Sequence, residues 1–105
     1  MKYKEYEFDS MRSEDFSFIY ITSPGCSVCK VLAPKLEEMS KEFPRATFHR
    51  IDLEENPLAK SKFMAFAIPT LIVYSLGQEM IRGSRHMDLG EINQKLTRYY
   101  ELIFS

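Results

Sequence analysis

The sequence predicts an α/β fold in which helices flank a central mixed β-sheet. The chain has 105 residues, the size of one domain. Short apolar segments typical of strands alternate with segments whose apolar residues follow helical spacing, and the chain ends in two strands and a helix. The expected order, β, β, α, β, α, β, β, α, places a mixed sheet between helical layers. We therefore expect a single domain over residues 1–105.

Two strands and a helix are expected in the first part of the chain. Residues 3–8 (YKEYEF) alternate weakly, which favours a short edge strand, whereas residues 16–22 (FSFIYIT) are aromatic and β-branched, as in a buried strand. Pro24 and Gly25 then interrupt the chain. A helix is predicted over Ser27–Phe43, because its apolar residues recur at intervals of four, three and four.

The middle of the chain predicts a strand, a short helix and another strand. Residues 46–53 (ATFHRIDL) return to alternation. Asn56 is the expected N-cap of the helix, with Pro57 in its first helical position and its end near Ala65. Residues 70–74 (TLIVY) are nearly all apolar, as expected of a strand covered on both faces.

A hairpin and a final helix are expected at the end of the chain. Gly77 and Gln78 predict a turn into residues 79–82, which would pair antiparallel with the preceding strand. The apolar residues from Leu89 to Ile103 follow helical spacing, and Asp88 and Glu91 resemble a capping box at its start.

Charge and hydropathy argue against nucleic acid and membrane as partners. The 14 basic and 15 acidic residues are interleaved and give a net charge of −1, whereas such partners require clustered Lys and Arg. Residues 1–15 contain acids and no apolar stretch typical of a secretory signal, and the apolar run 16–21 is too short to span a bilayer. We therefore expect a cytoplasmic protein, and the starting Met1 argues against a removed leader.

The only two cysteines, Cys26 and Cys29, lie three positions apart. About one pair of positions in fifty has this spacing in a chain of this length, so it is informative. Cys26 falls where a predicted strand meets a predicted helix, and the unpaired N–H groups and dipole of a helix start favour the thiolate. In such settings the pKa of a cysteine falls from about 8.5 to about 3.5–7.5.

This arrangement predicts thiol–disulfide exchange. The Cys26 thiolate would attack a substrate disulfide as the nucleophile and form a mixed disulfide, which Cys29 would resolve. Protein disulfides are the expected substrates, and a reductase or a low-molecular-weight thiol would restore the dithiol. We expect no cofactor.

Three other interpretations of the cysteines stay open. A structural zinc site needs about four ligands, but no second CxxC is present and the two histidines, His49 and His86, lie in a predicted strand and a loop. We therefore expect no metal. The cysteines could instead be buried and inert, or the dithiol could carry a metal ion as cargo.

Over about residues 16–103 the sequence resembles the thioredoxin family. The segment CSVCKVLAP contains the family's two cysteines, the following lysine (Lys30) and the helix proline (Pro34), and Ile68-Pro69-Thr70 resembles its cis-proline loop. The resemblance implies a thioredoxin fold and a thiol–disulfide oxidoreductase. It also implies that the Ile68–Pro69 bond is cis and that this loop faces the dithiol.

The resemblance further implies which residues contact a substrate. Pro69 has no amide proton and could pack against the sulfurs, while the backbone of Ile68 would pair with an extended substrate chain. The expected substrate-binding residues are Gly25, Ser27, Val28, Ile68 and Pro69.

The sequence also departs from the family pattern. The tryptophan before the first cysteine is replaced by Gly25, the buried acid six residues before that cysteine by Tyr20, and the lysine that accompanies the acid by Arg50. With Lys30 and Pro34, Tyr20 and Arg50 are expected to support the site. These departures leave the expected type of reaction unchanged, but they bear on whether the protein reduces or oxidises its partners and on which partners it binds. They also motivate an alternative, a non-catalytic adaptor that binds a protein partner. Nothing in the sequence requires more than a monomer.

Overall fold

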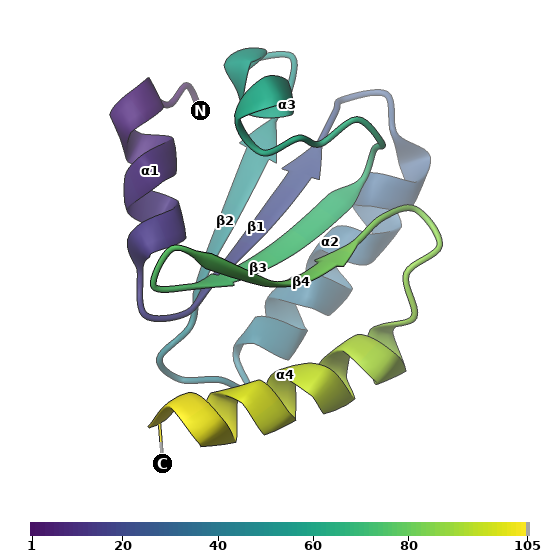
Figure 1. Ribbon diagram of the computed structural model, residues 1–105. Helices are drawn as coiled ribbons and strands as arrows, with labels where there is room; N and C mark the ends of the chain where they lie inside the picture. The colour runs from purple at the N-terminus through teal and green to yellow at the C-terminus, as the bar shows by residue number, and fades with distance from the viewer. Residues whose placement is uncertain (105) are drawn as a thin grey trace.

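The centre of the molecule is a four-stranded mixed sheet with the order β2-β1-β3-β4 (Figure 1). The computed structural model describes residues 1–104. Strand β1 is parallel to β2 and antiparallel to β3, which is antiparallel to β4. The elements are α1 (Glu5–Ser13), β1 (Ser17–Thr22), α2 (Ser27–Ser40), β2 (Thr47–Asp52), α3 (Leu58–Lys62), β3 (Thr70–Ser75), β4 (Gln78–Gly83) and α4 (Leu89–Phe104).

The two central strands, β1 and β3, are buried on both faces because helices cover both sides of the sheet (Figure 1). Side chains alternate along a strand, so each central strand supplies two separate cores. Phe18 and Val73 point toward α2 and α4, whereas Ile19 and Ile72 belong to the cluster that packs with α1 and α3. The fold class predicted from the sequence is confirmed.

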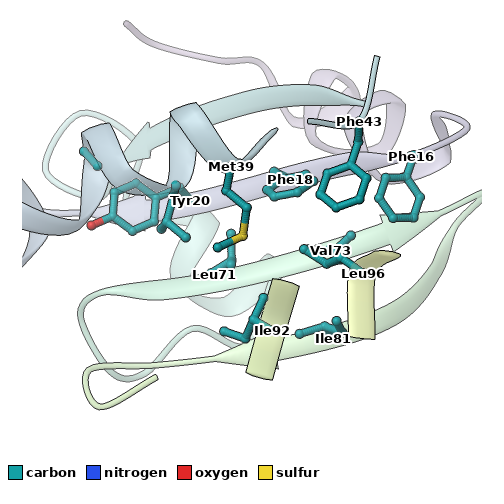
Figure 2. Close-up of a cluster of buried hydrophobic side chains, with 12 residues drawn as sticks. Phe16, Phe18, Tyr20, Met39, Phe43, Leu71, Val73, Ile81, Ile92 and Leu96 are labelled. Carbon is teal, nitrogen blue, oxygen red and sulfur yellow. The ribbon is translucent and has the colours of Figure 1, made fainter. Parts of the chain in front are cut away.

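The larger cluster, on the side of α2 and α4, is rich in aromatic rings (Figure 2). The ring of Phe16 lies 6.2 Å from those of Phe18 and Phe43 and 5.6 Å from that of Tyr100. The pairs of Phe16 with Phe18 and with Tyr100 meet edge to face, an arrangement favoured by the ring quadrupoles. The cluster joins β1 to α2 and α4 and thereby fixes the helix that carries both cysteines.

The strand predicted over residues 3–8 is wrong, because the segment forms the start of helix α1. Phe8 and Met11, three positions apart, are buried on one helix face. The Glu7 carboxylate accepts a hydrogen bond of 2.9 Å from the Lys4 backbone N–H, and negative charge in the first turn suits the helix dipole. Six weakly alternating residues were too few to distinguish the two-residue repeat of a strand from the 3.6-residue repeat of a helix.

The predicted cap of α3 is also wrong by one residue. Pro57 is the N-cap, and the helix ends at Lys62 because Met64 adopts a left-handed backbone with φ of 52°. The Asn56 side chain is buried and instead binds the start of the chain, accepting from the Tyr3 N–H at 2.7 Å and donating to the Met1 carbonyl at 2.8 Å. A tertiary contact therefore takes the side chain that would otherwise cap the helix.

The remaining predicted elements are confirmed with small shifts in their ends. Helix α2 ends at Ser40 rather than Phe43, although Phe43 still packs into the core from the turn that follows. At the start of α4, the Glu91 N–H donates to the Asp88 carboxylate at 3.1 Å, which is half of the expected capping box. None of the helices in residues 1–104 combines the length and the apolar character needed to cross a membrane.

Candidate redox site

The two loops that carry the predicted site leave the same edge of the sheet. Ile21, near the end of β1, pairs with Thr70, the first residue of β3. The loop from β1 into α2 contains Cys26, and the loop that enters β3 contains Pro69. Because the strands are antiparallel, the end of one lies beside the start of the other, and the two loops run close together in Figure 1.

Cys26 is the N-cap residue of α2. Its backbone is extended, with φ of −91° and ψ of 105°, and its Sγ accepts a hydrogen bond of 3.1 Å from the Cys29 N–H. The sulfur thus takes the place that a Ser or Asp oxygen has at most helix starts. A thiolate in this position would be stabilised by the same N–H and by the helix dipole.

The two cysteines form a disulfide, with their Cα atoms 5.3 Å apart. They differ in access to solvent: Cys26 is half-buried, whereas Cys29 is 1% exposed. Around Cys26, Gly25 and Ser27 are exposed and Val28 is half-buried. A partner that approaches from solvent therefore meets the sulfur of Cys26 first.

The neighbouring loop holds a cis peptide bond between Ile68 and Pro69, as the resemblance implied. Pro69 is buried and Ile68 is half-buried. Within residues 1–104 neither backbone polar group of Ile68 has a hydrogen-bond partner. Unpaired backbone groups beside a sheet can bind an extended chain in the manner of an added strand.

Tyr20 is fully buried beneath the site and is bonded to the backbone of the second cysteine. Its hydroxyl donates to the Cys29 carbonyl at 2.8 Å, and its ring lies 6.2 Å from that of Phe48. Burial raises the pKa of Tyr20, and the charge of Arg50 lowers it to a smaller degree. The phenol of Tyr20 therefore stays protonated at neutral pH, so no phenolate is available to accept a proton from Cys29.

Replacing Tyr20 by phenylalanine should cost about 0.5–1.5 kcal/mol of stability at neutral pH, because one buried hydrogen bond is lost. Turnover should stay within about twofold, since Tyr20 anchors the backbone and moves no proton. Urea unfolding and a disulfide-reduction assay measure the two effects. Tyr6→Phe is the control, because Tyr6 is exposed on α1. Equal stability of the Tyr20 and Tyr6 variants would contradict the anchoring role.

The same substitution should change the response to alkali. The folded-state pKa of Tyr20 lies above the ordinary value of 10.0, so the unfolded chain loses this proton first as the pH rises. The stability that this group contributes is therefore present below about pH 10 and declines above it. Tyr20→Phe should remove that part of the decline, which urea unfolding at rising pH would detect.

The other supporting residues line two different depressions. Lys30 and Arg50 are exposed and line a polar depression of about 280 Å³ together with Ser23 and Pro24. Pro34 lies in α2 five residues after Cys29, which corresponds to roughly 7.5 Å along a helix. It borders a second groove, further along α2.

The histidines lie apart from the cysteines in the chain and in their contacts. His49 lies on the edge strand β2, and its Nε2 is 2.7 Å from the Glu14 carboxylate. His86 is exposed. Within residues 1–104, no three side chains of His, Cys, Asp or Glu come together as a metal ion would require.

Sequence reasoning missed two exposed residues that come shortly before the cis-proline loop in the chain, Met64 and Phe66. Both are exposed although they are large and apolar, and they directly precede the cis-proline loop. The apolar run in KFMAFAIP was a possible signal, but a run of this kind is more often part of a core.

A CxxC pair at the start of a helix, beside a cis-proline loop on a mixed sheet, defines the class of thiol–disulfide oxidoreductases. Comparison with known proteins agrees. The family model for thioredoxin matches residues 1–98. The chain is 33% identical over 92 residues to the thioredoxin-like protein YdfQ of Bacillus subtilis, covering 88% of this chain and 82% of that protein. It is also 33% identical over 79 residues to a thioredoxin of Staphylococcus aureus, covering 74% of this chain and 76% of that one.

Solved structures agree as well. Thioredoxin 1 of Thermosipho africanus superimposes with a TM-score of 0.75 at 30% identity, over 82% of this chain and 96% of that one. Thioredoxin of Trypanosoma brucei brucei gives a TM-score of 0.81 at 25% identity, over 94% of this chain and 88% of that one. The chain belongs to the thioredoxin family and is a thiol–disulfide oxidoreductase.

Proposed function

We propose that the protein reduces protein disulfides, with Cys26 as the nucleophile and Cys29 as the resolving thiol. The observation that carries this assignment is the asymmetry of the pair. Cys26 is the more exposed cysteine and accepts the Cys29 N–H at the start of α2, whereas Cys29 is buried one turn along. The thiolate is favoured at the position that a substrate can reach.

The reaction starts from the reduced dithiol. The Cys26 thiolate attacks one sulfur of the substrate disulfide, a new S–S bond forms, and the other substrate sulfur leaves as a thiolate that takes a proton from solvent. The Cys29 thiol then loses its proton to solvent and attacks Cys26 Sγ, which releases the second substrate thiolate. Two electrons have passed to the substrate, and the protein holds the Cys26–Cys29 disulfide seen in the structure.

The backbone of Ile68 pairs with the extended substrate chain in this proposal, and Pro69 packs beside the reacting sulfurs. Gly25, Ser27 and Val28 form the rim around Cys26. Support comes from the unpaired backbone groups of Ile68 and the exposure of the rim. A reductase or a low-molecular-weight thiol returns the electrons. A cytoplasmic location and a monomeric state, both expected from the sequence, belong to the same proposal.

A non-catalytic adaptor is the second candidate, favoured by Gly25 and Tyr20 in the places of the family's tryptophan and buried acid. Cys29→Ser separates the two candidates. In a reductase this variant attacks substrates but cannot resolve them, so it should accumulate mixed disulfides with several proteins from an extract. The matched control is the double variant Cys26→Ser, Cys29→Ser. If the single variant captured no more protein than the double variant, the reductase assignment would be wrong.

A further inference from the structure

Two large apolar side chains, Met64 and Phe66, are held in solvent next to the cis-proline loop. They are 67% and 69% exposed, respectively. Both lie between the end of α3 and the start of β3, so their apolar character does not come from the buried face of a helix or strand. Neighbouring exposed apolar residues beside a reaction site are typical of a surface that contacts a partner.

The segment that carries these side chains is fixed by its neighbours. The Arg82 guanidinium, from β4, donates to the carbonyls of Met64 at 3.1 Å and Phe63 at 2.8 Å. Arg82 is itself oriented by two hydrogen bonds to the Glu79 carboxylate, of 3.1 and 2.8 Å. Phe63 and Ala65 are buried, each 1% exposed. Alternate residues are thus anchored in the core, and the two between them are presented to solvent in a preorganised form.

A surface depression of about 320 Å³ lies at these side chains. Its lining includes Met64, Phe66, Ala67 and Ser84. Two of the residues that line it, Phe66 and Ala67, directly precede Ile68 of the proposed substrate-binding loop in the chain. Side chains on one face of an extended chain repeat every two residues, or about 6.6 Å. For a substrate strand that pairs with Ile68 and continues along the chain toward Phe66, the side chain that reaches Phe66 belongs to a residue about two positions from the attacked cysteine.

We propose that Met64 and Phe66 select protein disulfides in which a large apolar side chain lies about two residues from the reactive cysteine. This inference rests on the proposed function and adds its substrate class. Gly25 offers no side chain on its side of the dithiol, so apolar recognition falls to the loop before Pro69. Phe66 is a specificity residue here and takes no part in the exchange of sulfur.

The test uses two disulfide-linked peptide dimers that differ only at the residue two positions from the cysteine, leucine in one and serine in the other. The wild type should reduce the leucine peptide with a kcat/KM about tenfold higher, the effect of one well-packed contact residue. Phe66→Ala should lose this preference through a raised KM for the leucine peptide, and Phe66→Leu should retain most of it. Leu102→Ala is the matched control, because Leu102 is 71% exposed on α4.

A small disulfide without flanking residues, bis(2-hydroxyethyl) disulfide, should react equally with all variants. The proposal is overturned if Phe66→Ala keeps the wild-type preference, or if it slows the peptides and the small disulfide to the same degree, which would place the effect at the dithiol. Failure of the proposed function looks different: the wild type would then reduce none of the three disulfides faster than Cys26→Ser does.

Discussion

Cys26→Ser should lower the rate of insulin reduction, driven by dithiothreitol, by at least about a hundredfold, to the rate without protein. A serine hydroxyl is almost fully protonated at neutral pH, so the start of α2 no longer holds an ionised nucleophile. The buried Cys29 is 1% exposed and cannot take over the attack on a protein disulfide. The turbidity of precipitating insulin chains measures the rate.

Ser10→Ala, on the exposed side of α1, is the control and should react like the wild type. Circular dichroism should show the same secondary structure for all three proteins, because the N-cap position tolerates serine well. A Cys26→Ser variant that reduced insulin as fast as the wild type would show that the exchange does not begin at this sulfur.

Phe18→Ala should destabilise the fold by about 3–5 kcal/mol, the largest effect expected from a single core substitution in this chain. Phe18 has no solvent exposure, and its ring lies 6.2 Å from those of Phe16 and Phe43, which Figure 2 shows beside it. The ring of Phe48 lies 6.4 Å from it. Truncation leaves a cavity between β1 and α2 that these rings can fill only in part. Against a total stability of about 5–15 kcal/mol, the loss is large.

Urea unfolding measures this loss, and Leu102→Ala on the exposed face of α4 should stay within about 0.5 kcal/mol of the wild type. A loss below about 1 kcal/mol for Phe18→Ala would mean that the aromatic cluster repacks, contrary to the close packing of the structure.

The central strands and the two long helices could be predicted because their patterns are long and unambiguous. The run TLIVY is buried on both faces as β3, and the spacing of Leu36 and Met39 defines the face of α2 that enters the core. The failures have local causes. Residues 3–8 satisfy a strand pattern and a helix pattern, and only the packing of Phe8 and Met11 against the sheet selects the helix.

The site was predictable where it depends on sequence position and not where it depends on packing. Cys26 follows a strand and a Pro-Gly break, so its place at a helix start could be inferred. The hydrogen bond from Tyr20 to the Cys29 carbonyl joins a strand to a helix, and no spacing rule indicates it. The exposure of Phe66 depends on Arg82, which comes from β4 and holds the loop from the neighbouring strand.

The alkylation rate of each cysteine in the reduced protein shows whether the start of α2 ionises Cys26. It is measured with limiting iodoacetamide and peptide mass spectrometry from acidic to alkaline pH. The helix start should keep Cys26 ionised below the ordinary cysteine pKa of about 8.5. We expect Cys26 to react at least about tenfold faster than Cys29 at neutral pH, and faster than cysteine in an unstructured peptide. Cys26 is not the ionised nucleophile if Cys29 reacts as fast, or if Cys26 follows the pH profile of the free peptide.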